Sequence, residues 1–256
     1  MLSNRTHTGG NIMSSISFSH LATAGKKLST LKIVDNIRKY YPNAYYFLGS
    51  DGIDDLSDIA NQYNCDYKFY ENRLGYPSYD SHKVLSWLER FKYACDNCNT
   101  THIMMVEDDV WIKKVLTIHD DWQMVGYNIT SPLGNIIPNN IIDSIGNFSG
   151  KRPISNQYGL GGGSIFNVST FLENYDRIVE WFTVNHDNYQ RQYDPLGYMD
   201  CYMLVCYFLC GKDYHGNPYY TDTHHHKNNG YDYDAFVNSQ PEHIEIVNNY
   251  KKYYWI

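Results

Sequence analysis

The sequence predicts an α/β protein with a mostly parallel central sheet flanked by helices, and three observations support this. First, strand-like apolar segments alternate with segments of helical spacing over residues 11–106. Second, the last of these strands, at 101–106, is continuously apolar, as is typical of a strand covered by helices on both faces. Third, the 256 residues are 43% hydrophobic and 19% charged, which suits one large domain or two fused lobes.

The first half alternates strands and helices. Apolar residues recur at helical spacing from Leu28 to Ile37, and Pro42 ends this first helix. The β-α order predicts that these strands pair in parallel. In open sheets of this kind, ligands bind beyond the carboxyl ends of the strands. We expect strands at 11–18, 44–52 (with a turn from Gly49), 67–71 and 101–106, and helices at 26–41, 53–63 and 81–95.

The second half is less regular and is expected to be smaller and mixed. Residues 134–150 are rich in Gly, Asn and Pro and predict loops with short strands. A glycine turn leading into a strand is expected at 161–168, followed by one amphipathic helix at 169–182 that begins near Ser169 or Thr170. Residues 198–209 are apolar nearly all round and predict a buried helix or strand.

Composition excludes several classes of protein. The formal net charge of -7 argues against nucleic-acid binding, which usually needs a basic face. No signal peptide is visible, and the longest apolar stretch, at 199–211, is too short to span a bilayer. The six cysteines include Cys95 and Cys98, but no second CxxC follows that would complete a zinc site. We expect a soluble, cytoplasmic protein with reduced thiols.

Three consecutive acids, Glu107, Asp108 and Asp109, directly follow the strand at 101–106. Crowded carboxylates at the end of a buried strand need compensation, and a divalent cation is the simplest one. In an extended segment Glu107 and Asp109 point to the same side, as a shared ion requires. Mg²⁺ and Mn²⁺ prefer carboxylate and phosphate oxygens. The alternative is a solvated turn.

The strand ending VEDDV, after three β-α units, resembles the GT-A glycosyltransferases, which use nucleotide-sugar donors and a DxD-type motif. The resemblance implies a GT-A type, Rossmann-like fold, with a nucleotide-binding half at 1–112 and an acceptor-binding half at 113–256 of one continuous domain. It implies Mn²⁺ or Mg²⁺ bound by Asp109 and Glu107, with Asp108 at the donor. Compact, anchorless enzymes of large DNA viruses and bacteria are similar in size; a virus-encoded member is expected in the host-cell cytoplasm.

The same resemblance implies further donor-binding residues. The strand-turn FLGSDG resembles the loop that contacts the nucleoside, with Ser50 and Asp51 at the donor. Gly162 and Gly163 resemble the second-half segment that approaches the donor sugar, because only glycine permits close approach of the backbone. A simple tight turn is the alternative for these glycines.

The remaining candidates lie late in the chain. YTDTHHHKNN resembles the segment whose late histidine completes the metal shell, here His224 or His226; an exposed histidine run is the alternative. Asp200, in apolar surroundings, is a candidate for a catalytic base or a transition-state stabiliser, and Asp194, before a proline, competes for this role. Either would act as the base of an inverting reaction. A structural, hydrogen-bonded aspartate is the alternative for both.

Basic residues between the third and fourth strands are candidates for the diphosphate. Arg73 and Lys83 are assigned to the donor, with ordinary surface charge as the alternative. Arg90 is expected on a solvated helix face and Trp87 in the core.

The predicted activity is transfer of a sugar, expected to be a hexose, from a UDP- or GDP-sugar to a glycan or glycoprotein hydroxyl, with retention or inversion left open. Two other classes remain. A metal-dependent phosphoesterase would also cluster acids at strand ends. A non-catalytic carbohydrate- or nucleotide-binding module would use some of the 26 tyrosines for stacking.

Overall fold

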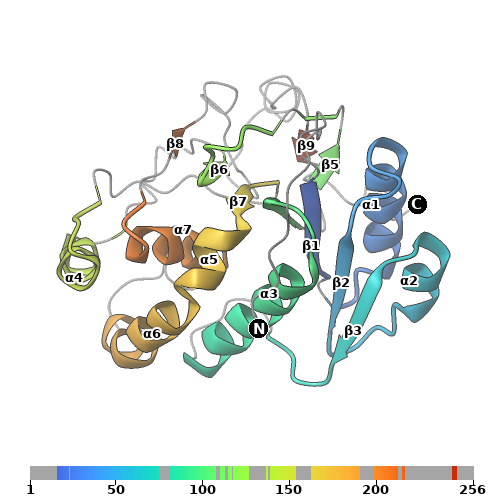
Figure 1. Cartoon of the computed structure of the whole chain (residues 1–256). Helices are drawn as coiled ribbons and strands as arrows, with labels where there is room; N and C mark the ends of the chain where they lie inside the picture. The colour runs from blue at the N-terminus through green and yellow to red at the C-terminus, as the bar shows by residue number, and fades with distance from the viewer. Residues whose placement is uncertain are drawn as a thin grey trace, which may run out of the picture.

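The structure is a computed structural model of the whole chain, drawn in Figure 1. It describes the following residues: 16–22, 24–74, 81–107, 110–112, 115–116, 118–126, 137, 139–153, 163–190, 199–212, 215–216 and 244–246.

A seven-stranded mixed sheet forms the centre of the molecule, in the order β3-β2-β1-β4-β7-β6-β8. The first four strands pair in parallel, β7 runs antiparallel to β4 and β6, and β8 is parallel to β6. The predicted α/β class with a mostly parallel sheet is confirmed. The strands are β1 (Ile16–Ala22), β2 (Tyr46–Asp51), β3 (Asp66–Tyr70), β4 (His102–Val106), β6 (Met124–Gly126), β7 (Ile165–Asn167) and β8 (His215–Gly216).

Helices cover both faces of this sheet. Figure 1 shows α1 and α2 on one side and α3, α5, α6 and α7 on the other. Neighbouring strand residues accordingly feed two separate cores, because side chains alternate along a strand: Phe47 packs in one core, and Tyr46 and Leu48 pack in the other. The helices are α1 (Lys27–Tyr40), α2 (Ser57–Tyr63), α3 (Ser81–Asn97), α4 (Asn139–Ser149), α5 (Val168–Glu173), α6 (Tyr175–Gln190) and α7 (Met199–Leu209).

Two predictions for the second half are wrong. Residues 139–149, expected as loops and short strands, form α4, because Ile141, Ile142 and Ile145 line one buried helical face that the surrounding Gly and Asn residues obscure. The single helix expected at 169–182 is two helices, broken at Asn174. The first of them is capped by Asn167, whose side chain accepts a hydrogen bond from the Thr170 amide.

The buried face of α1 also differs from the prediction. Leu28 is 48% exposed, whereas Thr30, Ile33, Val34 and Ile37 are buried. The buried stripe of α1 is therefore rotated away from Leu28. The prediction missed this because it counted apolar positions alone, whereas the buried stripe also includes polar residues such as Thr30.

The apolar segment near residue 200 is a helix rather than a strand. In α7, residues 202–209 are buried, and they lie in the core on the α3 side of the sheet. Among the described helices, none is both long enough and apolar enough to cross a bilayer.

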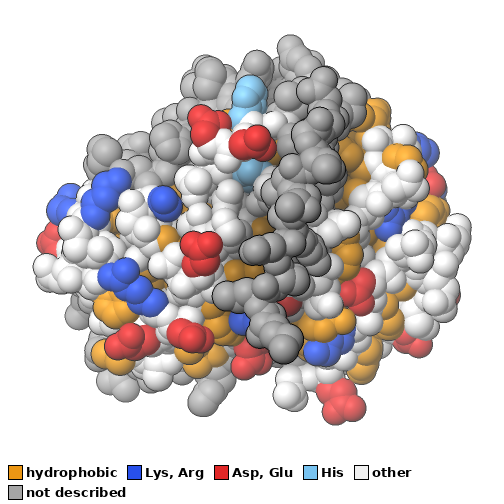
Figure 2. Space-filling view, viewed as in Figure 1, with side chains coloured by type: hydrophobic (Ala, Val, Ile, Leu, Met, Phe, Trp, Pro, Cys, Tyr) orange, Lys and Arg blue, Asp and Glu red, His pale blue; other side chains and the backbone are white. Residues whose placement is uncertain are grey.

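Charged side chains of both signs lie on the surface in view. Figure 2 shows acidic and basic groups over the described part of this face, where no continuous basic band crosses it.

Candidate functional site

The strand order creates a switch point between β1 and β4. From β1 the chain proceeds to β2 and then β3 on one side, whereas β4 pairs with β1 on the other. The register pairs His20 with Val106, so the carboxyl ends of β1 and β4 lie at the same edge. Open α/β sheets bind ligands in the crevice outside this point. The acidic segment starts here.

Glu107 is the described member of the acidic triplet, and it directly follows buried β4. Its side chain is partly exposed, and its carbonyl accepts a hydrogen bond from the Val110 amide at 3.2 Å. Gly163, with a φ of 90°, donates its amide to the Met105 carbonyl at 2.7 Å. Glu107 and Gly163, predicted to serve metal and donor respectively, thus both lie at the carboxyl end of β4.

A second anchor follows the acidic triplet. Strand β5 (Val110–Ile112) pairs antiparallel with β9 (Ile244–Ile246). Buried Asn36 of α1 brackets Ile112: its Nδ2 donates to the Ile112 carbonyl at 3.0 Å, and its Oδ1 accepts from the Ile112 amide at 2.7 Å. The acidic triplet therefore connects β4, a core strand, to β5, which is hydrogen-bonded to α1 through Asn36.

Sequence reasoning missed Asn36. The available signal was a polar residue between Val34 and Ile37 on a helix that faces the sheet, because a buried amide needs hydrogen-bond partners.

Asp51, at the end of β2, is held by two donors. Its Oδ1 accepts from the Leu74 amide at 2.7 Å and from Arg90 Nη1 at 3.0 Å, and the aspartate side chain is 12% exposed. The guanidinium of Arg90 lies 4.1 Å from the ring centroid of Tyr70, and its Nη2 donates to the Asn72 carbonyl. Asp51 and Arg90 together attach the segment after β3 to the end of β2 and to the middle of α3.

The expected solvated position of Arg90 is wrong, because the side chain is buried and its charge is paired with Asp51. A buried arginine requires a carboxylate or carbonyl oxygens around it, and Asp51 and Asn72 supply them. Trp87, by contrast, is buried as predicted. The assignment of Asp51 to the nucleoside stays a prediction, now for a carboxylate already engaged by the protein.

The loops after β1 and β2 are joined to each other. The Ser50 hydroxyl donates to the Asp54 carbonyl, and the Asp54 Oδ2 accepts from the Gly25 amide at 2.6 Å. Lys27 donates to the Asp55 carbonyl at 3.0 Å and lies 2.9 Å from Asp58 Oδ2. These contacts fix the loops that follow β1 and β2 relative to each other at the carboxyl edge of the sheet. The donor role of Ser50 stays a prediction, because its hydroxyl is buried and used within the loop.

Arg73 and Lys83 are the two basic side chains that the sequence assigned to the diphosphate. Arg73 is exposed and Lys83 is half-buried, and within the described residues no ion pair engages either. Their assignment to the diphosphate stays a prediction.

The remaining predicted site residues, or their side chains, lie outside the described part of the structure. The side chain of Asp200, in the first turn of α7, lies outside the described part. Within the described ranges no group of three or more His, Cys, Asp or Glu could hold a metal ion. The predicted residues outside the described ranges are Asp108, Asp109, Gly162, Asp194, His224 and His226.

Comparison with known proteins finds similarity only at the level of structure. No protein-family model matches the chain, and no curated protein sequence matches it. The galactosyltransferase LgtC, solved in complex with donor and acceptor sugar analogs, is 14% identical with a TM-score of 0.49, over 77% of this chain and 72% of LgtC. An active-site mutant of LgtC gives 12% and 0.48, over 74% and 69%.

A third similar structure, S. aureus TarS, is 11% identical with a TM-score of 0.42, over 79% of this chain but only 35% of TarS. Identities and TM-scores in this range do not establish a shared activity. The chemistry of this chain must therefore be inferred from its own residues.

Proposed function

We propose that this chain is a glycosyltransferase that moves a sugar from a nucleoside-diphosphate donor to an acceptor hydroxyl with the help of Mn²⁺ or Mg²⁺. The observation that carries the proposal is the place of Glu107, directly after buried β4 at the switch point between β1 and β4. The VEDDV resemblance supports the same activity.

The proposed cation is held by Glu107 and Asp109, with His224 or His226 completing its ligands. Carboxylate oxygens suit both candidate ions. The ion would supply positive charge to the departing nucleoside diphosphate. The partly exposed side chain of Glu107 fits this role, because a fully buried carboxylate could not meet a ligand from the crevice.

Donor binding is proposed to use both rims of the crevice. Arg73 and Lys83 contact the diphosphate, since neither is consumed by an ion pair within the described chain. Asp51 faces the nucleoside from a fixed position, and Asp108 lies at the donor. Gly162 and Gly163 allow the backbone to approach the donor sugar.

For the acceptor, Asp200 or Asp194 is proposed to remove the hydroxyl proton if the reaction inverts configuration. A UDP- or GDP-hexose is the proposed donor, and a glycan or glycoprotein the proposed acceptor.

A donor-hydrolysis assay tests this function. The chain is incubated with UDP- and GDP-hexoses, with Mn²⁺ or with a chelator, and release of the nucleoside diphosphate is measured. We expect slow, metal-dependent release from one donor and its loss in Glu107→Gln. The proposal is overturned if no nucleoside diphosphate is released from any donor. Cleavage of a simple phosphodiester instead would identify a phosphoesterase.

A further inference from the structure

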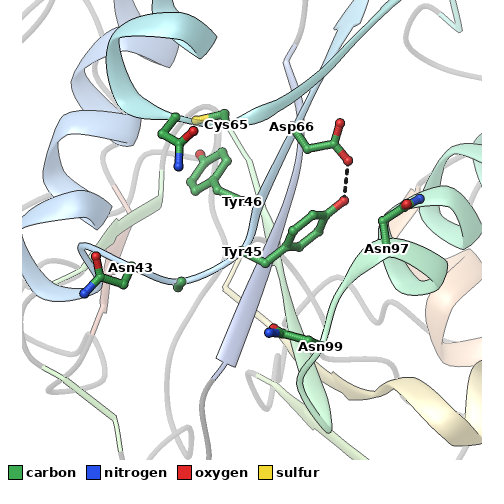
Figure 3. Close-up of a pocket in the computed structure, with 9 residues that line it drawn as sticks. Asn43, Tyr45, Tyr46, Cys65, Asp66, Asn97 and Asn99 are labelled. Carbon is green, nitrogen blue, oxygen red and sulfur yellow. Dashed lines mark hydrogen bonds between the residues drawn. The ribbon is translucent and has the colours of Figure 1, made fainter.

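A cavity lies at the amino-terminal edge of the sheet, opposite the candidate site (Figure 3). Its volume is about 460 Å³, within the range of small-molecule sites. It is formed where β2 and β3 begin and where α3 ends. The length of β2 separates it from the carboxyl edge by roughly 20 Å. The lining residues are Asn43, Ala44, Tyr45, Tyr46, Asn64, Cys65, Asp66, Asn97 and Asn99.

The lining is polar but carries no basic side chain. Its one carboxylate, Asp66, already accepts hydrogen bonds from the hydroxyls of Tyr45 at 2.7 Å and Tyr93 at 3.3 Å. An anion such as phosphate would meet a negative group, and the Arg38 guanidinium beside the cavity is already engaged by backbone carbonyls, which disfavours an anion. A cation would find a single carboxylate. The cavity therefore suits an uncharged polar ligand.

Amide groups dominate the cavity wall. Within the described chain, no hydrogen bond engages the side-chain amides of Asn43, Asn64 and Asn99, whereas Asn97 donates to the Tyr93 carbonyl at 2.8 Å. Each carboxamide offers two donors and one acceptor oxygen. A sugar hydroxyl donates and accepts at once, so several such amides match a ligand that presents several hydroxyls.

An aromatic face completes the cavity. Figure 3 shows Tyr45 between Asp66 and the asparagines Asn97 and Asn99. Its hydroxyl is held by Asp66, so the ring orientation is fixed. A tyrosine ring offers an apolar surface to the C–H face of a sugar while its hydroxyl stays polar.

The cavity is also preformed. The guanidinium of Arg38 donates to the carbonyls of Ala44 at 2.7 Å, Tyr63 at 2.9 Å and Asn64 at 2.9 Å. It thereby joins the loop before β2 to the loop before β3. Asn64 has a φ of 51°, a left-handed backbone conformation at the end of α2. A rigid site avoids the entropy cost of ordering loops on binding.

We propose that this cavity binds one neutral sugar residue of a glycan, at a site separate from the carboxyl edge. The tyrosine ring packs against the sugar and the asparagine amides bond its hydroxyls. This binding does not depend on transferase activity, and it would anchor a long glycan away from the reacting end.

Saturation-transfer NMR tests the site, with the methyl glycosides of glucose, galactose, mannose and N-acetylglucosamine as probes. The deletion variants are Asn64→Gly and Asn99→Ala. Glycine tolerates the left-handed backbone at position 64, and Asn99 is exposed, so both variants should fold. The matched control is Asn61→Ala, an exposed amide of α2 that does not line the cavity.

We expect one glycoside to give a signal with the wild type and Asn61→Ala, and at least fivefold less with the double variant Asn64→Gly/Asn99→Ala. Thermal stabilisation by UDP or GDP with Mn²⁺ should be equal in all three proteins, which separates this site from the proposed donor site. No signal with any glycoside up to roughly 20 mM would overturn the proposal, since that exceeds even weak millimolar affinities. An undiminished signal in the double variant, or displacement by inorganic phosphate, would overturn it as well.

Discussion

The two edges of the sheet are each held together by one arginine, in different ways. At the carboxyl edge, Arg90 is buried and paired with the Asp51 carboxylate at 3.0 Å. At the amino edge, Arg38 is half-buried and donates to backbone carbonyls from two loops. Both side chains use the planar fork of the guanidinium, which lysine lacks.

The difference teaches how charge is distributed between the two sites. The Arg90–Asp51 pair at the carboxyl edge has no net charge, so Arg90 is not available to a donor phosphate. In the proposed function the positive charge for the phosphates comes from Arg73, Lys83 or a cation. At the amino edge, the Arg38 guanidinium faces carbonyl dipoles, and the cavity beside it is lined by amides and by one carboxylate, Asp66, that tyrosine hydroxyls already engage. The first edge is suited to charged ligands and the second to uncharged ones.

Removing Arg90 should have the largest effect on stability. Arg90→Ala leaves the Asp51 carboxylate nearly buried without its partner, and we expect a loss of about 3–5 kcal/mol. Urea unfolding measures this. Arg152→Ala is the control, because its pair with Asp143 is exposed and should contribute less than about 1 kcal/mol. Equal losses in the two variants would show that Arg90 is not a structural anchor.

Removing Arg38 should cost less, because its partners are neutral and partly reached by water. We expect Arg38→Ala to lower the free energy of unfolding by about 2–3 kcal/mol, from the loss of charge-assisted hydrogen bonds. Arg38→Lys should recover only part of the loss, since one ammonium cannot reach both loops in the same geometry. Full recovery with lysine would show that charge alone, rather than the fork, holds the amino edge.

Asn36 offers a way to disturb the carboxyl edge without touching a charge. Asn36→Ala leaves the buried Ile112 amide and carbonyl without partners, and we expect a loss of about 1–3 kcal/mol. Stabilisation by UDP or GDP with Mn²⁺ should weaken by more than this stability change explains, because the acidic triplet loses its downstream anchor. Thermal-shift titration with Asn61→Ala as the reference measures both effects; unchanged nucleotide stabilisation would refute the anchoring role.

The smallest expected effect is a pH dependence at the amino end of β4. Burial lowers the pKa of His102 below the ordinary histidine value of 6.5, and the hydrogen bond to the Trp122 carbonyl and the charges of Asp120 and Asp121 oppose this shift. The unfolded chain therefore binds a proton at His102 more readily than the folded chain does. Above pH 6.5 this site does not reduce the free energy of unfolding, and below pH 6.5 that free energy falls as the pH drops towards the lower pKa of the folded state. Melting temperatures between about pH 8 and pH 5 should therefore fall less in His102→Gln than in the wild type. A parallel decline in both proteins would remove His102 as the cause.

Local sequence patterns predicted the parts of the fold whose signals are local. The β-α alternation of the first half, including the helix expected at 81–95, is confirmed, because each of these signals depends on residues within one element. The helix at 139–149 was missed because Gly and Asn residues outweighed three isoleucines. The composition of a segment and its periodicity gave opposite indications there.

The anchors of the candidate site were beyond prediction for a different reason. Arg90 and Asp51 are 39 residues apart, and Asn36 and Ile112 are 76 apart, so no local pattern joins them. Sequence reasoning did locate the acidic triplet, because it depends on one strand and the residues after it. It assigned Arg90 to solvent because an arginine on a helix is usually exposed.

The most direct test of the central claim is Mn²⁺ binding followed by electron paramagnetic resonance, in which free Mn²⁺ gives the signal. The account predicts that the wild-type chain with UDP or GDP removes this signal, and that Glu107→Gln weakens the uptake at least tenfold. Glu71→Gln, an exposed acid just after β3, should bind like the wild type. Equal Mn²⁺ uptake by Glu107→Gln and the wild type, or no uptake with either nucleotide, would contradict the account.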